Sequence, residues 1–441
     1  MLSLEKFRLA SKDLNRIALP LIIQNMTSVI IVATDKAIIG RVSPEAFNAV
    51  GVVGALLSLL AGIFGYISVQ FNIAGGKASI KENGSSELAD EFTSAIFLNV
   101  IIGIFFFVTL LLFSRPLFAV LYGFEGYMLD AAVAYASIMS IYLLLQLLLF
   151  SFGSLFKIKR NTKWILYVSL SVMGINLLLD FIFIIGMGFG VRAAAISNVI
   201  AKSIGLAIYV ILCRKEIKIS IDRFAIYGNK MVLTIKNSIP LMGQEVLEGS
   251  VFSLAVISVI ARVGDYHLSA YLVLTLILSF IMMPVYMYGS AILTLVSQID
   301  SKHEKEKYSL LPKVGLVLSL AIFIAISVVF YIFRDLLPFA ITNNDDVAKI
   351  ASSFLIFMVI ANIFEVVSTI YKYSLQVIGL SKFVLYRTAI INLVAAIILV
   401  VTTQVFRFEL YGVFICLFVN YSVASLVYFF KYKTTIQTTH A

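Results

Sequence analysis

Apolar stretches of 18 or more residues recur from one end of this 441-residue chain to the other. About 20 such residues cross the hydrocarbon core of a bilayer as one helix, and a helix satisfies its own backbone polar groups where lipid offers no partner. Only 13% of the residues are charged and 61% are hydrophobic, whereas soluble domains carry about 25% charged residues. The alternating pattern of a transmembrane β-barrel is not visible. We therefore expect an all-α polytopic membrane protein.

The apolar stretches predict twelve membrane spans, and the loops between them predict the orientation. In the loops, 23 Lys and Arg residues fall on one side and 7 on the other. Because cytoplasmic loops carry the excess of Lys and Arg, both termini of this multi-pass protein of the cell (inner) membrane are expected to be cytoplasmic. The same bias explains the net charge of +10 without a nucleic-acid partner. The spans lie at 15–39, 48–76, 92–113, 130–156, 164–187, 193–212, 238–260, 268–298, 314–333, 350–376, 383–404 and 412–430.

Short sequence matches between the two halves of the chain recur at a nearly constant offset, which indicates an internal repeat. Six spans per repeat give both halves the same orientation, so we expect two six-helix lobes related by a parallel repeat, with a cleft between them. The lobes are expected at 1–212 and 238–441, joined by a cytoplasmic loop at 213–237. The matches are Pro20 and Gln24 with Pro240 and Gln244, Ser154-Leu155 with Ser374-Leu375, Ile175-Asn176-Leu177 with Ile391-Asn392-Leu393, and Gly190-Val191 with Gly412-Val413.

Carboxylates inside the predicted spans are the main functional signal, because charge is costly in hydrocarbon and such acids face a cavity or a partner. Asn176 and Asp180 are four residues apart and share one helix face, and Gln244 and Glu248 repeat this spacing. A poorly solvated carboxylate holds a proton more readily than one in water, as a proton carrier must. The alternative is that some acids only pair with lysines. The acids are Asp35, Asp180, Glu245, Glu248 and Glu365, and the lysines are Lys36, Lys202 and Lys372.

Two prolines, Pro20 and Pro240, stand at matching places in the first and seventh spans. Inside a helix, proline removes a backbone hydrogen bond and bends the helix, whereas at a helix N-terminus it is well tolerated. The sequence leaves both interpretations open. Either these prolines kink their helices during transport, or they are ordinary N-terminal prolines.

The remaining residues argue against several other classes of protein. Cys213 and Cys416 give no disulfide framework, and three scattered histidines suggest no metal site. The segment ending at Ala78 is no phosphate-binding loop, because Phe71 stands where Gly is needed and Ala78 replaces Ser or Thr. No arrangement of nucleophile and base is visible. We expect neither an enzyme nor a cofactor.

Several segments resemble the multidrug and toxic compound extrusion (MATE) transporters, within the multidrug/oligosaccharidyl-lipid/polysaccharide exporter superfamily. The likeness runs from about residue 14 to 430. It is carried by Ala18-Leu19-Pro20 and Thr34-Asp35-Lys36 in the first helix, Asn176 to Asp180 and Gly188 to Val191 in the fifth helix and its exit, Ile239-Pro240 and Glu248 in the seventh, and Glu365 where the tenth helix usually carries Asp.

This resemblance implies an alternating-access antiporter that exports small cationic or amphipathic compounds in exchange for protons or sodium. We expect a small-molecule substrate and membrane lipid as its partners, and we expect it to act as a monomer. The resemblance also assigns roles to residues. The implied cation-coupling site is Asp35, Asn176 and Asp180, and the implied residues of the C-terminal lobe, at the substrate cavity, are Glu248, Glu365 and Gln244.

The chain departs from the family pattern at two lysines. Lys36 stands where a small polar residue is usual, and Lys202 stands where Gln is common. Both add positive charge near the acids of the N-terminal lobe, so we expect them to modulate that site; the alternative for Lys36 is that it snorkels to the membrane surface. The lysines also favour the second hypothesis, a lipid-linked oligosaccharide flippase, which must hold a pyrophosphate. The intramembrane acids favour the exporter.

Overall fold

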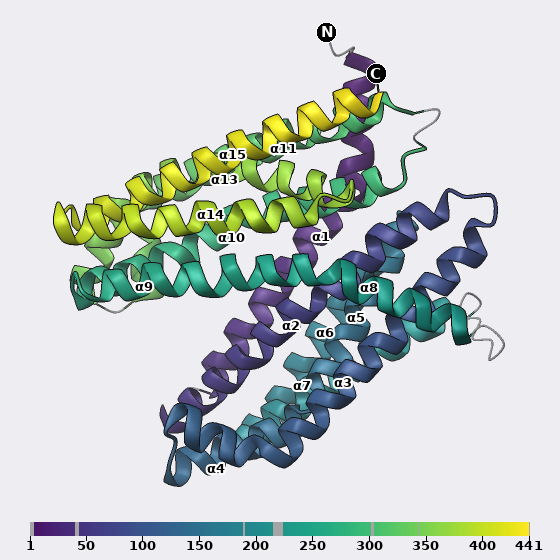
Figure 1. Cartoon of the computed structure of the whole chain (residues 1–441). Helices are drawn as coiled ribbons and strands as arrows, with labels where there is room; N and C mark the ends of the chain where they lie inside the picture. The colour runs from purple at the N-terminus through teal and green to yellow at the C-terminus, as the bar shows by residue number, and fades with distance from the viewer. Residues whose placement is uncertain are drawn as a thin grey trace. The chain divides into compact units, whose positions relative to one another are not determined.

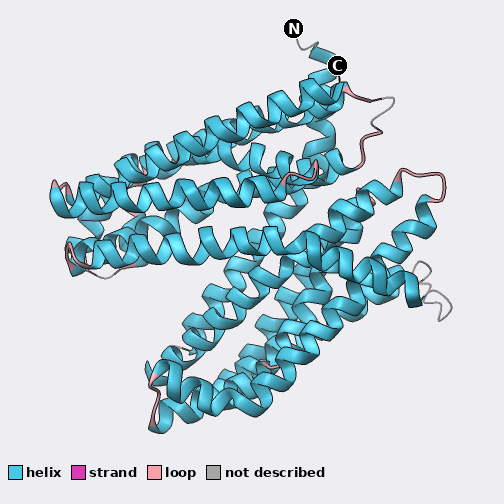
Figure 2. Ribbon diagram, in the orientation of Figure 1, coloured by secondary structure: helices cyan, strands magenta, loops and turns pink. Residues whose placement is uncertain are grey.

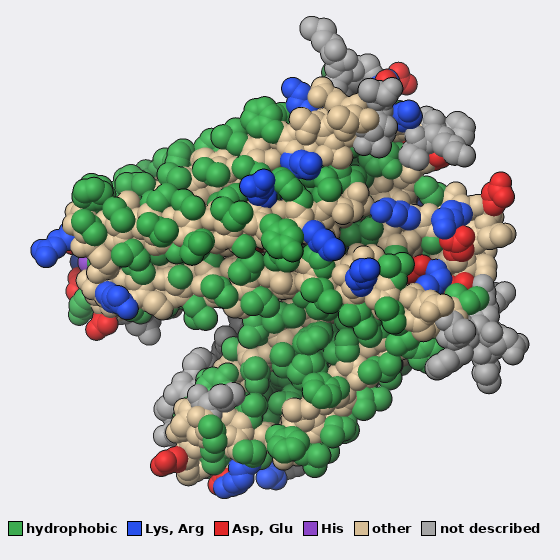
Figure 3. Space-filling model, in the orientation of Figure 1, with side chains coloured by type: hydrophobic (Ala, Val, Ile, Leu, Met, Phe, Trp, Pro, Cys, Tyr) green, Lys and Arg blue, Asp and Glu red, His purple; other side chains and the backbone are tan. Residues whose placement is uncertain are grey.

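The computed structural model describes residues 4–39, 44–187, 190–214, 224–300, 304–342 and 344–440, and the side chains of 30–39 and 44–48 lie outside the described residues. Figure 2 shows helices and no strand in this described part. Apolar side chains cover the visible sides of the helices (Figure 3); Ile101, Phe105 and Leu112 of α3 (Gly84–Tyr122) are examples of exposed ones. Such a surface is suited to lipid, so the expected all-α membrane fold is confirmed.

The helices follow one another along the chain with short connections (Figure 1). The first half contains α1 (Leu4–Ile39), α2 (Pro44–Ser79), α3, α4 (Gly126–Met139), α5 (Tyr142–Ile158), α6 (Lys163–Asp180), η1 (Phe181–Gly186) and α7 (Gly190–Cys213). The second half contains α8 (Phe224–Glu245), η3 (Val246–Phe252), α9 (Ser253–Ala261), α10 (Asp265–Ser297), α11 (Glu306–Ile332), α12 (Leu337–Ile341), α13 (Asp345–Val377), α14 (Ser381–Val400), η4 (Val401–Val405) and α15 (Glu409–His440). The elements written η are π-helical turns.

Eleven helical segments of the described residues are long and apolar enough to cross a membrane. They correspond to the second to twelfth expected spans, and α4 with α5 forms one of them. The expected first span, 15–39, lies in α1. The prediction of twelve transmembrane helices in two repeated lobes is therefore confirmed.

The expected cytoplasmic loop at 213–237 is wrong in its second part, because α8 begins at Phe224. Tertiary contacts explain this helical start. Tyr227 is buried, with its ring centroid 6.0 Å from that of Phe97, and the ammonium of Lys230 pairs with the carboxylate of Glu91 on α3. Lys230, one of the lysines that made this segment resemble a loop, therefore belongs to a packed helix.

The described chain divides into two compact units, residues 20–238 and residues 1–19 with 239–441. The segment 1–19, expected in the N-terminal lobe, thus belongs with the C-terminal helices. Within that unit, the Tyr288 hydroxyl of α10 donates a hydrogen bond to Asn15 Oδ1 of α1 at 2.6 Å. The boundaries fall beside Pro20 and Pro240, inside α1 and α8.

Each unit has its own core. In the unit 20–238, α2, α3 and α5 are joined by buried polar contacts; Asn99 Nδ2 donates to Ser151 Oγ at 2.7 Å, and Ser154 Oγ donates to the Ser68 carbonyl at 3.0 Å. In the other unit, apolar side chains of α10, α13 and α15 form the largest part of the core. This packing places α13, which carries Glu365, against α10 and α15.

Candidate functional site in the membrane lobes

The acid Glu248 lies in η3 and is held by a network of polar side chains. Its carboxylate accepts hydrogen bonds from Lys372 Nζ of α13 at 2.7 Å and from Gln244 Nε2 at 3.1 Å, with Thr388 Oγ1 at 3.5 Å. Gln376, one turn beyond Lys372, donates from Nε2 to Gln244 Oε1 at 2.8 Å. The side chains of Lys372 and Glu248 are 17% and 35% exposed. The charge of Glu248 is therefore balanced by Lys372 inside the lobe.

A second acid, Glu365 of α13, accepts a hydrogen bond from the Tyr286 hydroxyl of α10 at 2.8 Å. Glu248 and Glu365 both line a cavity of about 250 Å³ within the unit that contains residues 239–441. Asn362 lines it too, and in the described part of the chain its buried Oδ1 accepts no hydrogen bond. Aromatic and methionine side chains form much of the remaining wall, namely Phe252, Tyr271, Met282, Tyr286, Met358 and Tyr421, together with Ser253, Val256, Thr275, Leu278, Ser279 and Leu417. Acids facing aromatic rings suit a small cation.

In the other unit, Asn176 and Asp180 of α6 are both buried, at 1% and 0% exposure. The expectation that they share one helix face is consistent with this common burial. Neither amide atom of Asn176 has a hydrogen-bond partner among the described residues. The π-helical turn η1 starts directly after Asp180, and π-helical turns often mark functional sites.

Lys202 of α7 contacts α5 in the same unit. Its ammonium donates to Gln146 Oε1 at 2.7 Å and lies 4.8 Å from the ring centroid of Tyr142. Both contacts stabilise a cation at partial burial. From the sequence we also predict that Lys202 pairs with Asp180 or Asp35, and this pairing stays a prediction. Asp35 and Lys36 belong to α1, but their side chains lie outside the described residues, so their roles also stay predictions.

Pro20 and Pro240 both lie well inside their helices, since α1 begins at Leu4 and α8 at Phe224. The interpretation as ordinary N-terminal prolines is therefore wrong. The repeat extends to contacts near these prolines: Gln24 Nε2 donates to Ser28 Oγ at 3.5 Å, as Gln244 donates to Glu248. The acid is thus present at only one of the two equivalent places.

Sequence reasoning missed the residues that complete the site in the C-terminal helices. Gln376 and Thr388 join the Glu248 network, and Tyr286 binds Glu365. Only Gln376 had a signal in the sequence, because it lies four residues after Lys372 and so shares its helix face. The π-helical turns also had no signal.

Comparison with known proteins identifies the family to which this chain is similar. The MatE family model matches twice, at residues 20–182 and 240–402. The two matches therefore begin at Pro20 and Pro240, the same pair of prolines that marks the internal repeat. Together they cover more than half of the chain.

Individual relatives agree with this match. The uncharacterized transporter YisQ of Bacillus subtilis (strain 168) is 24% identical over 373 residues, which cover 81% of this chain and 79% of YisQ. A mutant of the Vibrio cholerae MATE transporter VcmN superposes with a TM-score of 0.87 at 17% identity, covering 98% of each chain. A MOP superfamily transporter from Pyrococcus furiosus, in which reverse polarity of the binding pocket suggests a different function, superposes with a TM-score of 0.85 at 16% identity, covering 98% of this chain and 97% of that one. The chain therefore belongs to the MatE family of membrane transporters.

Proposed function

We propose that this transporter is a secondary active antiporter that exports small cationic or amphipathic compounds in exchange for protons or sodium by alternating access. The observation that carries the proposal is the fully buried pair of Asn176 and Asp180 on one helix face. An acid at such a place gains stability when a proton or a sodium ion neutralises it. Asp35 of α1 is proposed as the second acid of this coupling site.

The two buried acid sites differ in a way that favours the N-terminal one for coupling. Glu248 already has the ammonium of Lys372 at 2.7 Å, so an ion binding there has to displace a tethered cation. Asn176 offers an amide oxygen that accepts no hydrogen bond from the described residues. An oxygen in that condition is a ready ligand for a sodium ion, or an acceptor for the proton of a neutral Asp180.

The proposed cycle uses the difference in ion affinity between two states. In the outward-facing state the coupling site binds its ion, and the loss of negative charge favours a rearrangement that releases substrate outward. Return to the inward-facing state delivers the ion to the cytoplasm. Pro20 and Pro240 lie where α1 and α8 pass from one compact unit to the other, so they are proposed to be the points at which these helices bend.

The cavity beside Glu365 and Glu248 supports a cationic substrate. Glu365, the aromatic walls and the acceptor of Asn362 attract positive charge, whereas Glu248 is already balanced by Lys372. The apolar surface of the cavity suits an amphipathic compound. We assign recognition, with partial loss on substitution, to this cavity. The chain is proposed to work as a monomer without cofactor or catalytic activity, in the cell membrane with both termini cytoplasmic.

The test is transport in vesicles. A panel of cationic dyes is loaded, and their efflux is measured while the proton gradient and the sodium gradient are collapsed separately. The proposal expects at least one dye to move, with efflux abolished by collapse of one gradient. Efflux of every dye at the rate of protein-free vesicles, under all gradients, would contradict an antiporter of cationic compounds.

The second candidate is a flippase for lipid-linked oligosaccharides. It is supported by Lys202, a partly buried lysine whose ammonium binds the neutral side chain of Gln146. Such a cation suits a pyrophosphate. In the same vesicles a fluorescent isoprenyl-pyrophosphate sugar separates the two functions. A flippase moves it without moving the dyes.

A further inference from the structure

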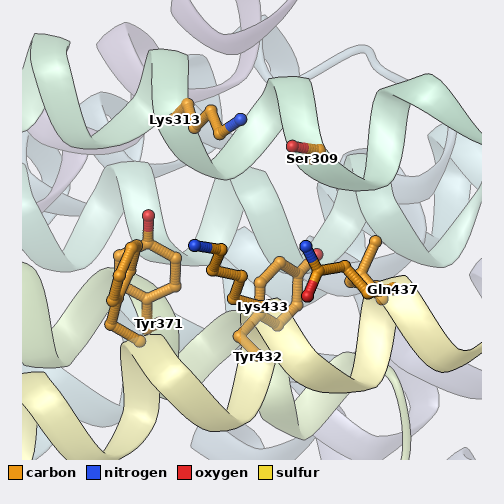
Figure 4. Close-up of a pocket in the computed structure, with 8 residues that line it drawn as sticks. Ser309, Lys313, Tyr371, Tyr432, Lys433 and Gln437 are labelled. Carbon is orange, nitrogen blue, oxygen red and sulfur yellow. The ribbon is translucent and has the colours of Figure 1, made fainter.

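A cavity at one end of α11, α13 and α15 has no role in the proposed transport cycle. It has a volume of about 290 Å³ and lies within the unit that contains residues 239–441. We propose that it binds the phosphate of an anionic phospholipid headgroup. Its lining residues are Ser309, Lys313, Tyr371, Phe429, Tyr432, Lys433, Ile436 and Gln437, most of which Figure 4 labels.

The depth of the cavity in the membrane is that of lipid headgroups. In α11 a run without charged residues extends from Val314 to Ile332, and at 1.5 Å per residue it is about 28 Å long. The hydrocarbon core is about 30 Å thick, so Lys313 lies at its edge. In α15 the uncharged run ends at Phe430, directly before the segment with Lys431 and Lys433. Both helices therefore bring a lysine to the same membrane boundary.

Among the described residues, no acid pairs with the lysines of the cavity. Neither Lys313 nor Lys433 forms an ion pair in the part of the chain that the structure describes, and both are exposed. The neighbouring acids of α11 are engaged elsewhere, since Glu306 pairs with Lys6 and Glu304 pairs with Lys307. An anion entering the cavity thus meets two lysines without acidic competition, and a basic pocket between membrane helices suits a phospholipid headgroup.

The cavity also contains tyrosine side chains that are held by aromatic packing. The ring of Tyr371 is held against Phe429 and Tyr432, with centroids 5.1 and 5.8 Å apart. Figure 4 shows the Tyr371 hydroxyl pointing toward the helix that carries Lys313, and the Lys433 ammonium turned toward the Tyr371 side chain. The Tyr432 hydroxyl donates to the Tyr308 carbonyl at 2.6 Å, which ties α15 to α11. The ring that carries the Tyr371 hydroxyl is therefore held in place before any ligand binds.

The surroundings favour a lipid over a soluble phosphate compound. On the side of the hydrocarbon core, α11 and α15 expose Val317, Leu426 and Phe430 at more than half of their surface, and such side chains can cover acyl chains. At about 290 Å³ the cavity lies at the lower end of the range for ligand pockets. This size suits a headgroup whose chains remain in the bilayer.

The test measures phospholipid binding to the full-length protein in detergent by native mass spectrometry. Phosphatidylglycerol and phosphatidylcholine are titrated separately, and glycerol 3-phosphate and inorganic phosphate are added as soluble competitors. The wild-type protein is expected to prefer phosphatidylglycerol. The double variant Lys313→Gln with Lys433→Gln should bind it about 30-fold more weakly, from the contribution of two lysines at an anionic surface. The variant Tyr371→Phe, which keeps the ring but removes the hydroxyl, should lose less of the affinity for phosphatidylglycerol than the double variant.

The matched control is the double variant Lys305→Gln with Lys382→Gln. It removes the same charge from exposed positions at the starts of α11 and α14, outside the cavity, and it should bind phosphatidylglycerol as the wild type does. Equal losses of phosphatidylglycerol affinity in both double variants, or no loss in either, would contradict the proposed site. Displacement of phosphatidylglycerol by millimolar glycerol 3-phosphate or phosphate would show a soluble ligand and overturn the lipid assignment.

Discussion

The ion pair between Lys372 and Glu248 gives the sharpest energetic prediction. The two charges are 2.7 Å apart, and their side chains are 17% and 35% exposed. Exposed pairs contribute 0 to about 1 kcal/mol, whereas removing one partner of a buried pair costs about 3 to 5 kcal/mol. Intermediate burial therefore predicts a loss of about 2 kcal/mol for Lys372→Met. The double variant with Glu248→Gln should be less destabilised than the sum of the single changes, because it leaves no charge unpaired.

The assay is a double-mutant cycle on the free energy of unfolding, measured by denaturant titration of the purified protein in one detergent. Lys6 and Glu306 provide the control, since they form an ion pair in the same unit with side chains 54% and 76% exposed. Their coupling energy should be far smaller than the value of about 2 kcal/mol that is expected for Lys372 and Glu248, because solvent screens an exposed pair. Equal coupling energies in the two cycles would refute the claim that Lys372 balances Glu248 inside the lobe.

Three further predictions concern the proposed coupling site, the hydrogen bond to Glu365 and the orientation of the protein in the membrane. Lys202→Gln should shift the pH dependence of transport if Lys202 is near an acid of the coupling site; an unchanged pH profile would count against that pairing. Tyr286→Phe keeps the ring but removes the hydrogen bond to Glu365, so the half-saturating concentration of a cationic dye should rise about tenfold, and an unaltered value would exclude this role. A tag on the C-terminus should be labelled only after the membrane is permeabilised, because labelling of intact cells would place that end outside.

The fold was largely predictable because lipid imposes a strong constraint on sequence. Each span must be apolar for about 20 residues. The distance along the chain between Pro20 and Pro240, which indicated the repeat, is also the distance between the starts of the two family matches. The error at the start of α8 has a physical reason. Lys230 is a polar residue of the kind expected in a loop, but it pairs with Glu91 on a distant part of the chain, and sequence alone does not reveal such a contact.

The site was predictable only along single helices. Spacing by four residues correctly placed Gln244 beside Glu248, where the structure has a hydrogen bond of 3.1 Å. Partners on other helices depend on how each helix is rotated about its axis, which composition does not fix in an apolar chain. For this reason Tyr286 and Thr388 were missed. The assignment of the segment 1–19 to the C-terminal helices likewise depends on tertiary contacts such as that of Asn15.

The central claim is that coupling takes place at Asp180 and Asp35, and the direct measurement is gradient-driven dye efflux by proteoliposomes of the asparagine variants. Asp180→Asn mimics the neutral form, so it should fold and insert as judged by size-exclusion chromatography, yet its efflux should no longer respond to the gradient. Asp35→Asn should behave alike, and the double variant should be little worse because the two acids act as a unit. Gradient-driven efflux retained by both single variants, together with its loss in Glu248→Gln, would place coupling in the C-terminal helices and contradict the claim.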